Sequence, residues 1–144
     1  MKVQISTDRA IRILQYLHVN TGEVATAMTI SQAVGVTYPF FIKIANQLKQ
    51  NGLIGTVQGR HGGYQLAKSA EEISVYDVFL STQGELKISN CLREDQHCKQ
   101  GAVSHCRIHD FFCSLQDKMI EAMKKENIAG LSYCLQFKEG EAIR

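Results

Sequence analysis

Four of the five cysteines and three of the five histidines of this chain lie within residues 90–113. Thiolate sulfur and imidazole nitrogen bind zinc in proteins, and thiolates hold iron–sulfur clusters. The stretch is therefore a candidate disulfide knot, zinc site, redox-sensitive thiol or iron–sulfur site. An odd number of cysteines does not suit a full set of disulfides. Metal binding or thiol chemistry is the better interpretation.

The amino terminus carries no long apolar run followed by a small-residue cleavage site, and no later stretch approaches the roughly 18 apolar residues of a membrane helix. We therefore expect a cytoplasmic protein with no membrane partner. A reducing cytoplasm keeps thiols reduced, which further disfavours a disulfide framework. The length of 144 residues suits one small domain with an appendage rather than two full domains.

The spacing of the candidate ligands narrows the choice of metal. Six residues separate Cys91 from Cys98, seven separate Cys98 from Cys106, and two separate Cys106 from His109. Structural zinc sites favour gaps of about two to four residues, because a tight turn must bring two thiolates onto one ion. The longer gaps favour a larger, softer centre. We expect an iron–sulfur cluster of the 2Fe–2S or 4Fe–4S type on the three cysteines.

Two residues compete for the fourth ligand position. If a long helix begins near Cys106, His109 lies one turn further on, whereas Cys113 lies roughly 10 Å along the axis. His109 is therefore the better ligand from the same chain. Asp8, near the start of the first expected helix, is the alternative ligand, supplied by a partner subunit. Among the remaining cysteines and histidines of the chain, we expect Cys113 and Cys134 as buried thiols, and His97 and His105 as solvated loop residues.

The first half of the chain predicts three helices. Residues 7–19 have the apolar spacing of an amphipathic helix, with Ser6 or Thr7 as a candidate amino-terminal cap. Residues 26–34 predict a short second helix that ends at Gly35. The third helix is expected to begin at Pro39, with Tyr38 outside it, and to end at Asn51-Gly52.

The third helix has an apolar stripe and a polar face. The stripe follows the spacing of core positions and comprises Phe41, Ile44, Ala45 and Leu48. The other face comprises Phe40, Lys43, Gln47 and Gln50. Amide, ammonium and aromatic groups of this kind read base edges in the major groove, with Gln pairing with adenine. An ordinary solvated face is the alternative interpretation.

Two alternating segments, residues 53–58 and 64–67, predict a β-hairpin with a glycine-rich tip at residues 59–63. Three helices followed by a hairpin with a basic tip is the plan of a winged helix-turn-helix domain, in which the tip arginine reaches phosphate or the minor groove. The predicted DNA-contacting residues are Tyr38, Phe40, Lys43, Gln47, Gln58, Arg60 and His61. The corresponding fold class is mainly α with a small β-hairpin wing.

Charge is distributed unevenly along the chain. Residues 24–70 contain no Asp or Glu, and twelve of the fourteen acidic residues follow position 70. Lys and Arg near phosphate release counterions, and carboxylates would oppose that gain. The acid-free segment favours a polyanionic partner, namely double-stranded DNA. Chance depletion in a mostly buried segment is the alternative explanation.

After a further helix expected within residues 71–82, residues 106–126 give the longest helical pattern. Its apolar stripe comprises Ile108, Phe111, Phe112, Leu115, Met119, Ile120 and Met123. A stripe this apolar needs a partner surface. We expect a dimerisation helix and hence a palindromic operator; packing on the chain's own core is the alternative. The expected division is a DNA-binding domain at residues 1–84, a cysteine-rich loop at 85–106, and a dimerisation helix with a tail at 107–144.

The stretch GLIGTVQGRHGGYQLAK, together with the cysteine loop and the long helix, resembles the Rrf-type family of bacterial regulators, which includes IscR, NsrR and CymR. The most specific positions are Asn51, Gly52, Leu53, Gly59, Gly62, Gly63 and Tyr64. The resemblance covers residues 1–127. It implies a homodimeric winged-helix transcription factor, usually a repressor.

The resemblance also implies roles for individual residues. Cys91, Cys98 and Cys106 match the cluster ligands of the family, His109 matches the fourth ligand of the IscR-like branch, and Asp8 matches that of the NsrR-like branch. The gaps between the cysteines are longer than in the family's cluster-binding members. In the wing, Gln58 stands where the family often has an arginine.

We expect a transcriptional regulator, and by the resemblance a repressor, whose operator affinity depends on a labile cluster that senses nitric oxide, redox state or iron. The alternative keeps the DNA-binding fold without a cluster and places control in cysteine oxidation or a partner protein. A metal-dependent redox enzyme is a remote alternative. The sequence lacks a Ser/His/Asp arrangement, a phosphate-binding loop and a C-x-x-C pair, so we expect no enzymatic activity.

Overall fold

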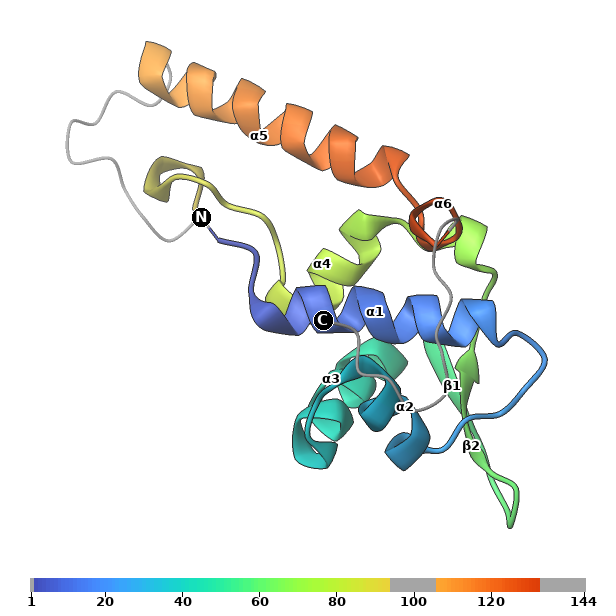
Figure 1. The fold of residues 1–144 in the computed structure, drawn as a ribbon. Helices are drawn as coiled ribbons and strands as arrows, with labels where there is room; N and C mark the ends of the chain where they lie inside the picture. Colours follow the sequence, from blue (N-terminus) through green and yellow to red (C-terminus); the bar gives the residue numbers. More distant parts are fainter. Residues whose placement is uncertain (1, 94–105, 133–144) are drawn as a thin grey trace.

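The computed structural model describes residues 2–93 and 106–132, which form a mainly helical fold with one hairpin (Figure 1). Strands β1 and β2 are antiparallel, with Ile54 opposite Leu66 and Val57 opposite Gly63. The predicted fold class is therefore confirmed. The elements are α1 (Ile5–Val19), α2 (Ala27–Val34), α3 (Tyr38–Gln50), β1 (Ile54–Val57), β2 (Gly63–Leu66), η1 (Ala70–Glu72), α4 (Val75–Gln83), η2 (Asn90–Leu92), α5 (Arg107–Lys125) and α6 (Ile128–Leu131).

Local capping sets the bounds of α2 and α3. The Thr26 hydroxyl accepts a hydrogen bond from the Thr29 N–H, and Gly35 ends α2 in the left-handed conformation at φ 72°. Thr37 caps α3 by accepting from the Phe40 N–H. Because the cap is Thr37, Tyr38 is the first helical residue. The expectation that Tyr38 lies outside the helix is wrong.

The amino terminus of α1 has no side-chain cap from its own segment. The cap position is Gln4, so the prediction that Ser6 or Thr7 caps this helix is wrong. Thr7 is buried instead, and its hydroxyl donates to Gln83 Oε1 at 2.7 Å. The same Gln83 oxygen accepts from the Gln4 N–H at 2.9 Å. The end of α4 thus satisfies the start of α1.

Helix α4 begins later than the sequence pattern indicates. Ser74 caps it by accepting from the Asp77 N–H, while the Asp77 carboxylate accepts from the Ser74 N–H at 2.9 Å. Ile73 is buried as predicted but precedes the helix, and the two glutamates before it lie in η1. The capping box therefore splits the expected helix into a short turn and α4.

The core joins α1, α2, α3 and the wing. All four residues of the predicted apolar stripe of α3 are buried. Tyr64 packs edge-on against Phe41 with 5.3 Å between ring centroids, and its N–H donates to the Ala25 carbonyl at 2.8 Å. A Cβ on Gly63 would lie 2.2 Å from that Ala25 carbonyl oxygen, so only glycine fits there. The wing is thereby fixed to the chain before α2.

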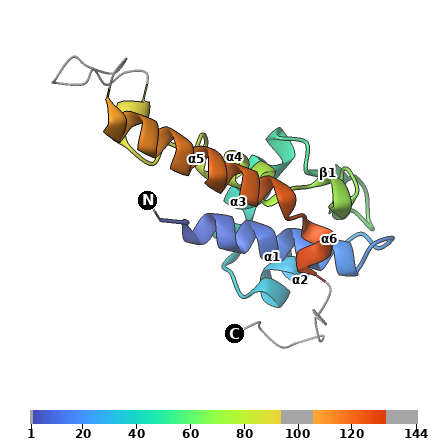
Figure 2. The ribbon, with the colours of Figure 1, turned by 90° about the horizontal axis from the view of Figure 1, so that it is seen from above.

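Helix α5 lies across the domain and extends past it, with η2 packed beside its amino-terminal half (Figures 1 and 2). Two backbone hydrogen bonds hold its carboxyl end: Val75 N–H to Glu126 O at 2.9 Å, and Ile128 N–H to Ile73 O at 3.0 Å. The Lys124 ammonium lies 5.2 Å from the centre of the Tyr76 ring. No helix of the described ranges is long and apolar enough to cross a membrane.

Candidate DNA interface and metal centre

Helices α2 and α3 and the hairpin lie on the side of α1 away from α5 (Figure 1). The acid-free segment, residues 24–70, spans all of these elements. The fold therefore gathers a carboxylate-free part of the chain on one side of the molecule. Electrostatically, this side is suited to a phosphate backbone.

Helix α3 exposes a polar face at its centre. Lys43 is exposed, as predicted, and Tyr38 is 49% exposed at the start of the helix. Asn46, three residues after Lys43, is also exposed, and the predicted set of contacts omitted it. Residues three apart lie on the same side of a helix, so the spacing from Lys43 would have been enough to include Asn46.

Two other predicted contacts of α3 are less available than expected. Phe40 is half-buried and packs against the core, because it lies one turn before the buried Ile44. Its placement as an exposed aromatic is wrong. Gln47 is half-buried, and its Oε1 is buried without a hydrogen-bond partner among the described residues. A two-point contact with adenine needs that oxygen, so the Gln47 side chain would first have to turn outward.

The wing tip presents its predicted residues to solvent. Gln58, Arg60 and His61 are all exposed. Gly59 adopts a left-handed φ of 110°, and a Cβ on Gly62 would lie 2.3 Å from the Val57 carbonyl oxygen. The two glycines allow the tight turn that carries Arg60 outward. Within the described residues, neither Arg60 nor Lys43 forms an ion pair.

Tyr64, on β2, is half-buried. Burial raises the pKa of Tyr64 from 10.0, and the neighbouring Tyr38 raises it further. Both effects move the loss of the Tyr64 phenol proton to higher pH.

The candidate metal ligands come from two elements that pack together. Cys91 lies in η2, half-buried, with its Sγ 3.2 Å from the Ser89 hydroxyl. Cys106 is the half-buried cap residue of α5, and both thiols are free. Cys98 lies outside the described residues, as do His97, His105 and Cys134. Among the described residues, no three potential ligands form a cluster.

His109 has one imidazole nitrogen with no hydrogen-bond partner in the described part of the chain. It lies half-buried on α5, one turn after Cys106, and its Nε2 is 3.4 Å from Cys113 Sγ. Its Nδ1 is buried and has no hydrogen-bond partner among the described residues. A buried unpaired polar atom costs free energy, and a bound metal would satisfy it. Thiolates with an imidazole are a donor set that iron–sulfur clusters take. The donor chemistry of Cys91, Cys106 and His109 therefore suits the predicted group.

Cys113 is not the fully buried thiol that the sequence predicts. It is half-buried, and it contacts His109 because the two residues lie four apart on one face of α5. The four-residue spacing between His109 and Cys113 is present in the sequence and is the signal for this contact.

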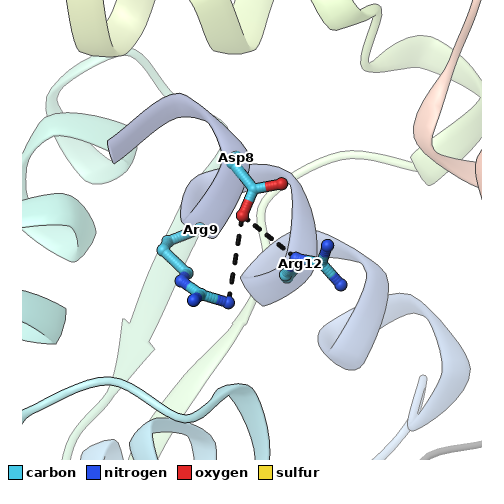
Figure 3. A network of polar contacts seen from close by, with 3 residues as sticks. All are labelled: Asp8, Arg9 and Arg12. Carbon is cyan, nitrogen blue, oxygen red and sulfur yellow. Dashed lines mark hydrogen bonds and ion pairs between the residues drawn. The ribbon is translucent and has the colours of Figure 1, made fainter. Parts of the chain in front are cut away.

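Asp8 is held by its own helix (Figure 3). Its Oδ2 lies 3.1 Å from Arg12 Nε and 3.9 Å from Arg9 Nη1, and its side chain is 47% exposed. To serve as a ligand for a partner subunit, the carboxylate would have to exchange these arginines for the metal.

Comparisons with known proteins decide the family. The model of the Rrf2 family, described as an iron-dependent transcriptional regulator, matches residues 3–133. The chain belongs to the Rrf2 family. Protein aau3 of Rhizobium meliloti strain 1021 is 30% identical over 132 residues, covering 87% of this chain and 86% of that protein. The HTH-type transcriptional regulator NsrR of Shouchella clausii is 25% identical, covering 98% and 99%.

Solved structures of similar fold include two regulators. CymR, the global cysteine regulator of B. subtilis, has a TM-score of 0.76 at 16% identity, covering 94% of this chain and 99% of that one. IscR of T. potens has a TM-score of 0.71 at 19% identity, covering 91% and 85%. These structures show the winged-helix fold, and the family match shows the role: the chain is an Rrf2-family transcriptional regulator, a family of DNA-binding regulators rather than enzymes.

Proposed function

We propose that this Rrf2 protein is a homodimeric repressor whose operator affinity is set by a labile iron–sulfur cluster on Cys91, Cys98, Cys106 and His109. The observation that carries the proposal is the buried Nδ1 of His109, one turn after Cys106 on α5, which has no hydrogen-bond partner among the described residues. The description of the family as iron-dependent supports it. Asp8 of the partner subunit is the alternative fourth ligand.

On the DNA side, α3 enters the major groove and the wing reaches the neighbouring backbone or minor groove. Lys43 and Asn46 at the centre of α3 contact base edges or phosphate, with Tyr38 at the start of the helix. Arg60 at the wing tip contacts phosphate, flanked by Gln58 and His61. Gln47 contributes only after its side chain turns outward. Lys43 and Arg60 form no ion pair within residues 2–93 and 106–132, and their exposed positive charges support this assignment.

The exposed apolar face of α5 supports a dimer. Ile108, Leu115 and Ala122 are exposed and recur every seven residues, with Phe111 between the first two. Exposed fractions of 66% for Ile108 and 61% for Phe111 are high for large apolar side chains. The seven-residue repeat is that of a helix-pairing seam. Two chains paired through this face of α5 would read a palindromic operator with half-sites roughly 34–36 Å apart.

A route from the metal ligands to the DNA-binding side runs through α5. A bound cluster supplies a centre that reacts with nitric oxide or oxidants and is lost when iron is scarce. Cys91 on η2 and Cys106 at the start of α5 fix those two elements together when both bind it. The far end of α5 is hydrogen-bonded to Val75 and Ile73 at the start of α4. Loss of the ligand contacts would loosen the packing of η2 on α5 and allow α5 to shift against the winged domain.

Anaerobic reconstitution with iron and sulfide tests the cluster assignment. The wild-type protein should gain visible absorbance and bound iron and sulfide, whereas Cys91→Ala and Cys106→Ala should bind at most a small fraction of that iron. Cys134→Ser is the control, because Cys134 is a predicted non-ligand, and it should load fully. A wild-type protein that stays colourless while still binding DNA would remove the cluster and leave the regulator.

The alternative is thiol control without a cluster. It is favoured by the similarity in fold to CymR, including a structure of Staphylococcus aureus CymR described as an oxidized form, with a TM-score of 0.70. Cys91 and Cys106 are free thiols. A metal-free protein that loses operator affinity with a mild oxidant and regains it with a reductant would establish this function in place of the first.

A further inference from the structure

His109 contacts Cys113, and the proposed set of four cluster ligands gives that cysteine no role. The two side chains lie one turn apart on the half-buried face of α5, with Nε2 of His109 3.4 Å from Sγ of Cys113. The two residues are four positions apart in the sequence and therefore share that face. Cys113 is too far along the helix from Cys106 to share one metal conveniently with it. Cys113 instead lies beside the imidazole of His109.

A neutral imidazole carries one N–H donor and one lone-pair acceptor. If Nε2 carries the proton, it can donate to Cys113 Sγ, and the lone pair then lies on Nδ1. Nδ1 is the nitrogen that is buried and without a partner among the described residues. Metal-binding histidines generally donate their other N–H to a neighbouring acceptor, which fixes the ring and the protonated nitrogen. Carboxylates and carbonyls usually fill that place, and here a sulfur does.

We propose that Cys113 is a positioning residue that holds His109 with its proton on Nε2 and its Nδ1 lone pair free to bind the cluster. This inference rests on the proposed function, since it assigns an orienting partner to one of the proposed ligands. It also predicts which ring nitrogen binds. Cys113 itself contacts no metal.

The metal-free protein gives the first test, which needs no substitution. With 15N-labelled histidine at about pH 8.5, where imidazoles are ordinarily neutral, the nitrogen shifts and long-range couplings show which nitrogen carries the proton. The protein as it stands should show His109 predominantly protonated at Nε2. Cys113→Ala should lose that preference, and Cys113→Ser, which keeps an acceptor, should retain most of it. A His109 protonated at Nδ1 in the wild-type protein overturns the proposal.

The loaded protein gives the second test. Cys113→Ala should release iron to a chelator about tenfold faster than wild type, and Cys113→Ser should recover most of the difference. Electron spin echo modulation from 15N-histidine should show directly bound nitrogen in the wild type and none in His109→Ala. Adding Cys113→Ala to His109→Ala should change the release rate little.

The outcomes separate the two proposals. A wild-type protein that binds no cluster overturns the proposed function, and the positioning role falls with it. A wild-type protein that binds a cluster, in which Cys113→Ala changes neither the release rate nor the nitrogen coupling, overturns the positioning role alone. A full effect of Cys113→Ala in the His109→Ala background also overturns it, because Cys113 would then act by another route.

Discussion

Lys43 on α3 and Arg60 at the wing tip are exposed cations, and neither forms an ion pair within the described part of the chain. They differ in what surrounds them. Lys43 lies at the centre of a helix face that fits the major groove, beside Asn46, whereas Arg60 lies on a glycine-rich turn that reaches outward. We therefore expect Lys43 to affect sequence preference and Arg60 to affect mainly electrostatic affinity.

Arg60→Ala should weaken binding to operator and unrelated DNA alike. A phosphate contact releases counterions, so its loss should reduce the slope of log affinity against log salt by about one unit per subunit. Fluorescence anisotropy over a salt series measures that slope. Lys125→Ala removes the same charge from the far end of α5 and should leave the slope unchanged. An unaltered slope in Arg60→Ala would place the wing tip away from DNA.

The exposure of the candidate DNA-contacting residues follows from the sequence for some of them and not for others. The exposed cations and the tip residues could be predicted because their side chains leave a turn or a helix face without depending on distant neighbours. Phe40 and Gln47 could not, because they lie at the boundary of the buried stripe, where packing decides whether a side chain faces the core or solvent. The His109–Cys113 contact is local, and its four-residue spacing would have been enough to predict it.

At the scale of single elements, the bounds of the helices follow their caps. Thr26, Thr37 and Ser74 each accept a backbone N–H at the start of a helix, and each is a residue type that favours this position. The start of α1 is different, since Gln83, 79 positions along the chain from Gln4, supplies its acceptor. Local patterns predict the first kind of boundary and carry no signal for the second.

Ser74→Ala should destabilise the protein by about 1 kcal/mol, because it removes the cap of α4 and half of the reciprocal pair with Asp77. Urea unfolding followed by circular dichroism measures the change. Ser114→Ala, at an exposed position within α5, is the matched control and should stay within about 0.5 kcal/mol of wild type. Equal stabilities for the two variants would show that the capping box contributes little.

At the scale of the whole molecule, α5 has two apolar faces with different neighbours. One is half-buried against the chain itself, and the Gln116 side chain on that side accepts from the Ile88 N–H at 3.1 Å. The other carries Ile108, Phe111 and Leu115 and is exposed. The residues of the predicted apolar stripe therefore divide between two surfaces of α5, one half-buried and one exposed. Both interpretations of the stripe, packing on the chain's own domain and packing on a partner, have residues to support them.

Leu115→Glu should weaken the dimer at least tenfold without unfolding the subunit, because Leu115 is 38% exposed in the single chain and central to the proposed seam. Sedimentation velocity measures the association, and operator affinity should fall with it. Ser114→Glu, on the neighbouring exposed face, should remain dimeric. A Leu115→Glu protein that is dimeric and binds the operator normally would rule out this seam.

The proposed metal centre on η2 and α5 is coupled to the DNA-binding side formed by α3 and the wing. The most direct measurement of this coupling is operator affinity by anaerobic fluorescence anisotropy on a single preparation, first loaded and then stripped of iron by a chelator. We expect an affinity change of at least about tenfold, or 1.4 kcal/mol, that disappears in Cys106→Ala. Equal affinity of a demonstrably loaded and a stripped wild-type protein would contradict it.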